Sequence, residues 1–539
     1  MQNLPSLNQK LKEYLEDNNS KITLIKGEKH TLFSKGDLKQ GIIRARNAFS
    51  KAGVKQGDIV IFQINSSAKK AFLSNFFALV SLGAVPAFLT ASRNRDQVHR
   101  LKNVAQSNPK SFIVADDETL QFIKFLWEDI DEKRLIITHE ENQDDFKTTE
   151  SDIAYADVKP SDNVLILYSS GSTSDPKGVV MQNESFLKMI KSLEVALSLS
   201  EKDRWLIWLP LEHVFGILAG VVLPMYSKSN VVHMDAGDFI RNPKSWLDAI
   251  HQTRANKSAA PNFAYPMILK ALDGSENWDL SCIDFILNGG EPLSRKVVEI
   301  FEKTTEKFKL KKNAIAPVYG LTEALGGVCL NIKACYPEID LNQLKSGIDF
   351  DLTTIKRGDM DLISQGFAIP GMEIGIFDSE NHRLEELTIG EIHIKSEALF
   401  SGYLNIDSSG LFVDGWFDTG DLGFLYMDML YVVGRKKDMF FIHGKNVYLR
   451  DIEQVVEKKF SYRVAACGEN NSQTGENAVY LFIETANTDE IPIQKIKNFV
   501  FSEMGFSLKE VIPIKQFIRT ALGKIAKQKT LEAYKNGKI

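Results

Sequence analysis

Short apolar runs alternate with helix-like repeats over the first third of the chain. Residues 37–52 carry apolar side chains at helical spacing, residues 58–64 (DIVIFQI) form a short apolar run, and residues 69–82 are helix-like again. Further apolar runs of strand length occur at residues 111–115, 163–167, 205–209, 230–234 and 283–287. This alternation predicts parallel sheets covered by helices. Because ligands bind beyond the carboxyl ends of such strands, we expect the chemistry in the loops that follow them.

The pattern changes near residue 365. Short strands with Gly and Asp turns follow (MEIGIFD, GEIHIKS), which predicts a mostly antiparallel, β-rich subdomain over about 365–433. A compact α+β pattern begins after residue 434. We therefore expect an α/β fold whose large N-terminal domain, residues 1–433, has two mainly parallel sheets plus the β-rich subdomain. A small α+β C-terminal domain would cover residues 434–539.

Composition narrows the class of protein without indicating its function. Of 539 residues, 44% are hydrophobic and 25% are charged, which is typical of globular proteins and excludes disordered, collagen-like and coiled-coil chains. The net charge of −5 gives no reason to expect nucleic-acid binding. Four scattered cysteines suit free thiols better than a disulfide framework or a metal site. No apolar stretch reaches the ~18–20 residues of a membrane span, and the first residues do not resemble a secretory signal, so we expect a cytoplasmic protein.

The strongest local signal is the segment 165–179, LILYSSGSTSDPKGV. An apolar run leads into a loop of small hydroxyl residues and glycines, whose backbone N–H groups could approach a phosphate closely. Hydroxyl donors and a cation would add to this binding. The alternative, a flexible polar loop, stays open, since Ser/Gly clusters are common. The candidate phosphate-binding residues are Ser169, Ser170, Gly171, Ser172, Thr173 and Lys177.

This loop and several later motifs resemble the adenylate-forming (AMP-binding) superfamily of acyl-CoA synthetases, luciferases and nonribosomal-peptide adenylation domains. The loop is similar to the family's [S/T]SG[S/T]TGxPKG signature, except that Ser174 stands where glycine is usual. Glu212 is also unusual in the segment similar to LPLxH. The motifs are similar in order along essentially the whole chain: SSGSTSDPKG, LPLEH (209–213), NGGEP (288–292), YGLTEA (319–324), FDTGDLG (417–423), GRKKD (434–438) and RTALGKI (519–525).

The resemblance implies a ligase that uses ATP and Mg²⁺ to activate a carboxylate as acyl-AMP, with release of pyrophosphate. Nucleotide binding would fall to the phosphate loop named above, to the adenine-binding strand end, to the YGLTEA turn and to a pair that takes the ribose hydroxyls. In this sequence these further residues are Gly289, Gly290, Glu291, Tyr319, Gly320, Asp421 and Arg435.

Catalytic roles are likewise implied by the resemblance. Glu323 would bind Mg²⁺ together with Thr173, and Thr322 would hydrogen-bond the α-phosphate. Lys524 would reach in from a mobile C-terminal lid that rotates about Lys437 and would bridge the developing negative charge. His213 would lie beside the acyl carboxylate, although a histidine on an apolar loop is often purely structural.

Three features are most similar to one branch, the fatty acyl-AMP ligases, which pass the acyl group to an acyl carrier protein. They are AAPNFAY (259–265), Glu291 in NGGEP, and a candidate insertion at about 341–365 that the resemblance links to exclusion of coenzyme A. The expected partners are a fatty acid and an acyl carrier protein, or a carrier domain of a polyketide or nonribosomal-peptide system. Alternatives are an acyl- or aryl-CoA synthetase and an inactive nucleotide-binding homologue; the alternative for the insertion is a surface excursion.

The C-terminal segment is basic although the chain is not. Residues 505–539 hold eight Lys and Arg against two acids. Since acyl carrier proteins are acidic, a basic patch could steer one toward the active site. A merely solvated basic helix end remains the alternative.

Overall fold

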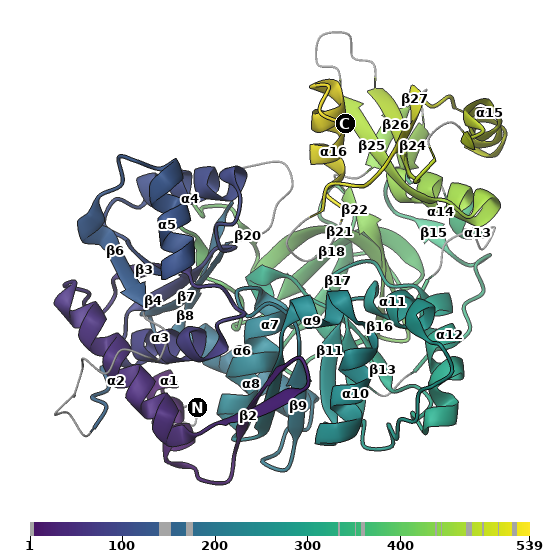
Figure 1. Cartoon of the computed structure of the whole chain (residues 1–539). Coiled ribbons are helices and arrows are strands. Elements are labelled where there is room, and N and C mark those ends of the chain that lie inside the picture. Colours follow the sequence, from purple (N-terminus) through teal and green to yellow (C-terminus); the bar gives the residue numbers. More distant parts are fainter. Residues whose placement is uncertain are drawn as a thin grey trace.

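The computed structural model describes most of the chain and shows a large body with a smaller C-terminal unit above it (Figure 1). The described residues are 5–138, 152–168, 176–332, 335–350, 352–356, 362–436, 439–442, 445–470, 477–487, 490–504, 506–519 and 525–539. Lys437, the predicted hinge, lies outside them.

The first sheet of the large body has seven strands and is mainly parallel. β3, β4, β5, β6 and β7 run parallel, and the β7–β8 hairpin and β19 extend one edge with antiparallel pairs. In spatial order the strands are β19 (Gly402–Tyr403), β8 (Gly178–Gln182), β7 (Asn163–Tyr168), β4 (Val85–Phe88), β3 (Ile59–Gln63), β5 (Phe112–Asp116) and β6 (Leu135–Thr138).

The second sheet has fifteen strands and joins two regions that the sequence pattern separates. β1, β10, β9, β11, β12 and β13 run parallel, and β14 then pairs antiparallel with both β13 and β16, so the β-rich region continues the same sheet. The predicted α/β class is thus confirmed, and the strands of the β-rich region belong to the same sheet as the parallel strands. Its strands are β2 (Lys29–Phe33), β1 (Ile22–Lys26), β10 (Asn230–Met234), β9 (Arg204–Ile207), β11 (Lys257–Ala260), β12 (Phe285–Asn288), β13 (Ile315–Tyr319), β14 (Cys329–Leu330), β16 (Ser364–Ala368), β22 (Met429–Arg435), β21 (Trp416–Tyr426), β18 (Thr388–Lys395), β15 (Lys345–Ser346), β17 (Glu373–Phe377) and β20 (Phe412–Val413).

Helices cover these sheets, and α3 (Lys69–Leu82) has most of its residues buried, as its nearly uniform apolar sequence requires. None of the described helices has the length and apolar character needed to cross a bilayer. The other helices of the large body are α1 (Leu7–Glu16), α2 (Lys35–Lys51), α4 (Arg95–Ser107), α5 (Asp117–Leu126), α6 (Asn183–Ala196), α7 (Val214–Ile217), α8 (Leu223–Ser227), α9 (Ala236–Arg241), α10 (Lys244–Thr253), α11 (Ala264–Ala271), α12 (Arg295–Thr305) and α13 (Thr353–Lys356).

The C-terminal unit has hydrophobic clusters of its own. Among the described residues, those from 449 onward form two clusters that include no residue of the large body. The division at residue 434 stays a prediction, and separate cores are what it would require. The elements are β23 (Met439–Ile442), β24 (Lys445–Tyr448), α14 (Leu449–Phe460), β25 (Arg463–Asn470), β26 (Asn477–Glu484), α15 (Ile493–Met504), β27 (Glu510–Ile514) and α16 (Lys527–Lys535).

Several described residues of the candidate insertion pack on the β-rich strands. β15 pairs in parallel with β18, and Leu344, Phe350 and Ile355 are buried in a cluster with residues of β18, β21 and β22. Leu344 is only 1% exposed. Described residues of the segment 341–365 therefore contribute to a hydrophobic core.

We predict that Leu344→Ala destabilises the protein, because truncating a fully buried leucine typically costs about 2–5 kcal/mol. Urea unfolding followed by tryptophan fluorescence measures the loss. Leu32→Ala, at a leucine that is 57% exposed, is the matched control and should stay within about 0.5 kcal/mol. Equal effects of the two substitutions would contradict the packing described here.

Candidate functional site

Lys177 lies at the end of the segment predicted to bind phosphate. β7 and β8 pair so that Tyr168 lies opposite Gly178, while residues 169–175, with Ser169, Ser170, Gly171, Ser172 and Thr173, lie outside the described residues. β19 pairs with β8, and the Lys177 Nζ lies 5.0 Å from the centroid of the Tyr403 ring. A cation is thus held over an aromatic face beside the loop.

A tight turn after β13 brings Glu323 to this edge. A Cβ on Gly320 would lie 2.0 Å from the carbonyl oxygen of Gly326, so only glycine fits there. The 3₁₀ helix Thr322–Ala324 follows, and the Tyr403 hydroxyl donates to Glu323 Oε1 at 2.8 Å. Burial, and after it the Glu323 charge, raises the pKa of Tyr403 far above its usual range, so this hydroxyl remains a donor. Lys177, Tyr403 and Glu323 therefore form one group, and a single carboxylate beside phosphates suits Mg²⁺.

A second group forms at the other end of the same turn. The Tyr319 hydroxyl donates to Asp421 Oδ2 at 2.7 Å, and Arg435 Nε lies 3.2 Å from Asp421 Oδ1. Asp421 and Arg435 are direct partners in the β21–β22 ladder. Burial raises the pKa of Tyr319 well above its usual range, and the Asp421 charge adds to this. The pair offers a carboxylate acceptor and a fixed guanidinium donor, which suits two neighbouring hydroxyl groups.

The loop after β12 connects two segments that the sequence singles out. A Cβ on Gly289 would lie 2.5 Å from a Val318 methyl, and Gly290 has a φ of +81°, so both positions favour glycine. Glu291 Oε1 accepts a hydrogen bond from the Phe263 backbone N–H at 2.6 Å. This bond joins NGGEP to PNFAY, so Glu291 has a structural task in addition to any contact with the nucleotide.

His213 caps a helix. It precedes α7, and its Nδ1 accepts a hydrogen bond from the Phe215 N–H at 3.3 Å. A Cβ on Gly216 would lie 1.9 Å from the Pro210 carbonyl oxygen, which fixes this turn. The structural reading of His213 thus has direct support, while its predicted place beside the acyl carboxylate stays a prediction.

The neighbour of His213 belongs to a buried polar cluster that sequence reasoning missed. Glu212 Oε2 is buried without a hydrogen-bond partner among the described residues, and so are both ring nitrogens of His233. Burial lowers the pKa of Lys69 to about 8, against the opposing charges of Glu212 and Asp235. Burial, and after it Lys69, lowers the pKa of His233 to about 3, so this imidazole is neutral. In the sequence Lys69 reads as an ordinary helix-start lysine, and only tertiary packing shows its burial.

Lys524 lies outside the described residues, but its flanks are held. Arg519 and Ile525 form an isolated bridge, and Arg519 Nη2 lies 3.0 and 3.1 Å from the two oxygens of Glu484. Thr322 begins the 3₁₀ helix next to Glu323. The roles assigned to Lys524 and Thr322 remain predictions.

The sequence matches the AMP-binding enzyme family over residues 12–404. The chain belongs to this family. The motifs predicted this family.

Relatives of this AMP-binding enzyme differ in function. Aspulvinone E synthetase melA from Aspergillus terreus is 26% identical over 488 residues, which cover 86% of this chain but 50% of the relative, so the chain spans about half its length. The medium-chain-fatty-acid–[acyl-carrier-protein] ligase JamA from Moorena producens is 28% identical over 404 residues, 68% of this chain and 67% of JamA.

Solved structures show the same range. An McyG A-PCP structure complexed with phenylalanyl-adenylate has a TM-score of 0.84 at 25% identity, covering 100% of this chain and 96% of that one. A structure from work on fatty acyl-adenylate ligases of E. coli and L. pneumophila has a TM-score of 0.83 at 24% identity and covers 99% of both chains. Fatty acyl-AMP ligases are therefore among the structural neighbours, as predicted, but fold alone does not separate the two groups.

We predict that Tyr319→Phe weakens AMP binding about 5- to 10-fold, because it removes a hydrogen bond worth about 1–1.5 kcal/mol that orients Asp421. Isothermal titration with AMP measures the affinity without knowledge of the acid substrate. Tyr426→Phe, on the same strand as Asp421, is the control and should bind as the unchanged enzyme does. Equal affinities in both variants would count against this site.

Lys69 predicts a pH dependence of stability. Since its pKa is lowered to about 8 in the folded state, the Lys69 side chain holds one more proton in the unfolded chain between about pH 8 and about 10.4, and its contribution to stability should rise with pH in that window. The full effect is about 3 kcal/mol at 1.36 kcal/mol per pKa unit. Urea unfolding across this range should show a flatter slope for Lys69→Met, whereas the control Lys70→Met should keep the slope. A slope unchanged by Lys69→Met would refute the assignment.

Proposed function

We propose that the enzyme activates a fatty acid as acyl-AMP and then transfers the acyl group to the phosphopantetheine thiol of an acyl carrier protein. The observation that carries the first half-reaction is the convergence of two charged groups on one turn. Lys177 and Glu323 lie with Tyr403, and Asp421 and Arg435 lie with Tyr319 just before that turn. Relatedness to JamA supports a fatty acid and a carrier-protein acceptor.

In the first step a carboxylate oxygen attacks the α-phosphorus of ATP, and the bond to the bridging oxygen breaks to release pyrophosphate. Both reactants are anions, so catalysis depends on positioning and on neutralising charge. Glu323 and Thr173 would hold Mg²⁺, which supplies positive charge to the phosphates. Lys177 would add positive charge near the phosphates, Arg435 with Asp421 would hold the ribose, and Lys524 would add a further cation.

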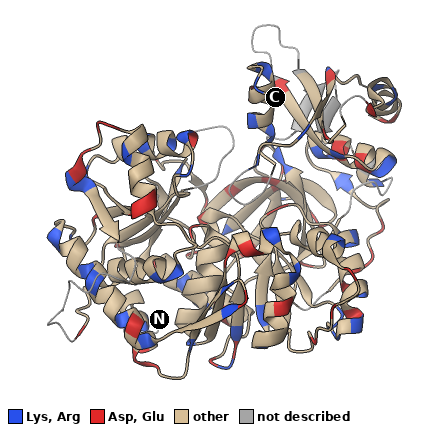
Figure 2. Cartoon of the chain, in the orientation of Figure 1, with Lys and Arg blue, Asp and Glu red and all other residues tan. Residues whose placement is uncertain are grey.

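In the second step the carrier thiolate attacks the acyl carbonyl, and AMP leaves. The charge on the surface of the C-terminal unit is relevant to which acceptor the enzyme uses. Lys and Arg are spread along α16 and its neighbours (Figure 2). Four of the eight basic residues of this segment pair with acids elsewhere: Arg519 with Glu484, Lys527 with Glu453, Lys529 with Asp96 and Lys535 with Glu469.

These ion pairs reduce the number of basic residues that are available to attract an acidic carrier protein. Lys509, Lys515 and Lys538 are exposed, and no described acid forms an ion pair with them. We propose that these three lysines, more than the overall basic balance, attract an acidic carrier. Lys529–Asp96, at 3.6 Å, instead links the C-terminal unit to α4 of the large body.

The test compares acceptors with one enzyme preparation. Full-length protein, ATP and Mg²⁺ are incubated with fatty acids of several lengths, and with aryl and amino acids, and pyrophosphate release is measured. Coenzyme A or a holo-acyl carrier protein is then supplied, and the thioester is detected by mass spectrometry. We expect release with a fatty acid and thioester on the carrier protein only.

Two variants make this test specific. Lys524→Ala should lower pyrophosphate release at least 100-fold, on the order of a lost electrostatic contact to the transition state, and Lys538→Ala should not. Efficient acyl-CoA formation would favour a CoA synthetase, and activation of only aryl or amino acids would favour the chemistry named for McyG. No release from any acid would favour the inactive homologue. Deleting residues 341–365 would not be a clean test of whether this segment excludes coenzyme A, because the deletion removes Leu344 and exposes the hydrophobic cluster around it.

A further inference from the structure

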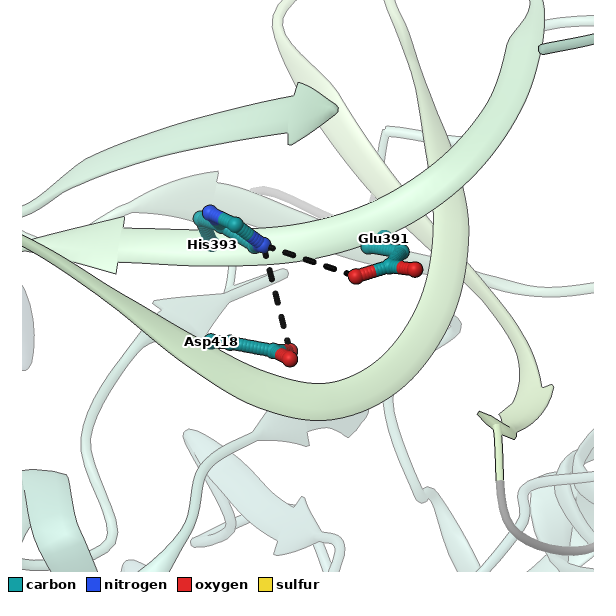
Figure 3. A group of neighbouring side chains, drawn as sticks. All are labelled: Glu391, His393 and Asp418. Carbon is teal, nitrogen blue, oxygen red and sulfur yellow. Dashed lines mark ion pairs between the residues drawn. The ribbon is translucent and has the colours of Figure 1, made fainter. Parts of the chain in front are cut away.

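Three side chains on the β-rich part of the large sheet point toward one another, and none of them belongs to the two groups described above (Figure 3). Glu391 and His393 lie two positions apart on β18, so they share one face of the strand. The ladder register places Asp418 of β21 directly opposite His393. The register of the β18–β21 ladder shifts between Glu391 and His393, as it does at a β-bulge.

The distances suit a common ligand better than hydrogen bonds within the cluster. His393 Nε2 lies 3.8 Å from Glu391 Oε2 and 3.9 Å from Asp418 Oδ1, beyond hydrogen-bond reach. One ligand atom from each residue lies within 4.8 Å of the others. Tetrahedral ligands at about 2.0–2.1 Å from one ion lie about 3.3–3.4 Å apart, so the three side chains would have to move closer together when an ion binds.

His393 provides a second and independent observation. It is 5% exposed, and its Nε2 has no hydrogen-bond partner in the described part of the chain. A buried polar nitrogen without a partner costs about 1–3 kcal/mol. A cation between the three residues would remove that cost, since Nε2 is aimed at both carboxylates (Figure 3).

The surroundings hold the three side chains in place. The Phe377 ring stacks on the His393 ring, with centroids 4.6 Å apart and an interplanar angle of 22°. The Gly420 N–H donates to Asp418 Oδ1 at 2.8 Å. Lys436 Nζ lies 2.5 Å from Glu391 Oε1, which leaves the other oxygen, Oε2, as the one that faces His393. Such outer contacts typically orient metal ligands.

We propose that Glu391, His393 and Asp418 bind one divalent transition-metal ion, with Zn²⁺ as the representative. Imidazole with carboxylates is a ligand set for Zn²⁺, whereas Mg²⁺ prefers oxygen ligands alone. The two carboxylates outweigh the Lys436 ammonium, so the cluster attracts a cation. The Asp418 side chain is 46% exposed, which leaves room for water as a further ligand. The ion would clamp β18 to β21 three residues before Asp421.

The test measures metal binding directly and needs neither ATP nor an acid, so its result is independent of the proposed function. Full-length protein is stripped with a chelator and titrated with Zn²⁺ by calorimetry in excess Mg²⁺; Co²⁺ replaces Zn²⁺ for visible absorption. We expect one ion per chain, with a dissociation constant in the micromolar range or below. His393→Asn should weaken binding at least about 10-fold.

The matched control is His382→Asn. His382 Nδ1 lies 3.2 Å from Asp378 Oδ2 and 3.8 Å from Glu380 Oε2, but its side chain is 71% exposed. This substitution removes a similar group from the same region and should leave Zn²⁺ affinity unchanged. A loss as large as that of His393→Asn would overturn the proposed site.

Because His393 is buried, its variant could misfold, and Asp418→Asn provides the second arm. Asp418 is half-exposed, so circular dichroism should report a folded protein. Zn²⁺ should raise the melting temperature of the unchanged enzyme and not that of Asp418→Asn. Absence of stoichiometric Zn²⁺ binding, or equal affinity in Asp418→Asn, would overturn the proposal.

Discussion

The close backbone approach at Gly320 is the constraint on which the site depends. No side chain fits between this residue and the Gly326 carbonyl, so the chain reverses at once after β13. The reversal leaves Tyr319 on one side, where it bonds Asp421, and Glu323 on the other, where it accepts the hydrogen bond from Tyr403. A nucleotide with a ribose and a polyphosphate needs groups of both kinds a short distance apart, and a looser turn would separate them.

The end of β22 shows how the large body holds the junction with the C-terminal unit. Two consecutive cations lie there, and each pairs with a largely buried acid: Arg435 with Asp421 and Lys436 with Glu391. Any rotation about Lys437 would therefore begin directly after two residues that ion pairs hold to the large body. The acids also belong to other arrangements, Asp421 to the tyrosine pair and Glu391 to the cluster with His393, so the junction and both candidate sites share side chains.

Local elements followed the sequence closely where the length of an apolar segment suits one kind of element. The predicted helix 69–82 and strand 230–234 match α3 and β10, because 14 mostly apolar residues suit a buried helix and 5 suit a buried strand. The predicted strand 205–209 ends instead at Ile207, since β9 is only as long as its pairing with β10 and β11. The sequence did not indicate how the β-rich region connects to the parallel strands, because β14 joins them and a two-residue strand leaves almost no sequence signal.

The sequence by itself determined the family and the identity of most candidate site residues, because short motifs fix residue types at fixed spacing. Tertiary structure alone decided which of them meet. Tyr403 lies close to Glu323 only because its strand, β19, pairs with β8, and these two strands are far apart in sequence. Lys69 becomes unusual only because packing removes its water, and Asp418 faces His393 only through the register of two strands. Such contacts depend on long-range pairing and burial, which a linear pattern of residues does not encode locally.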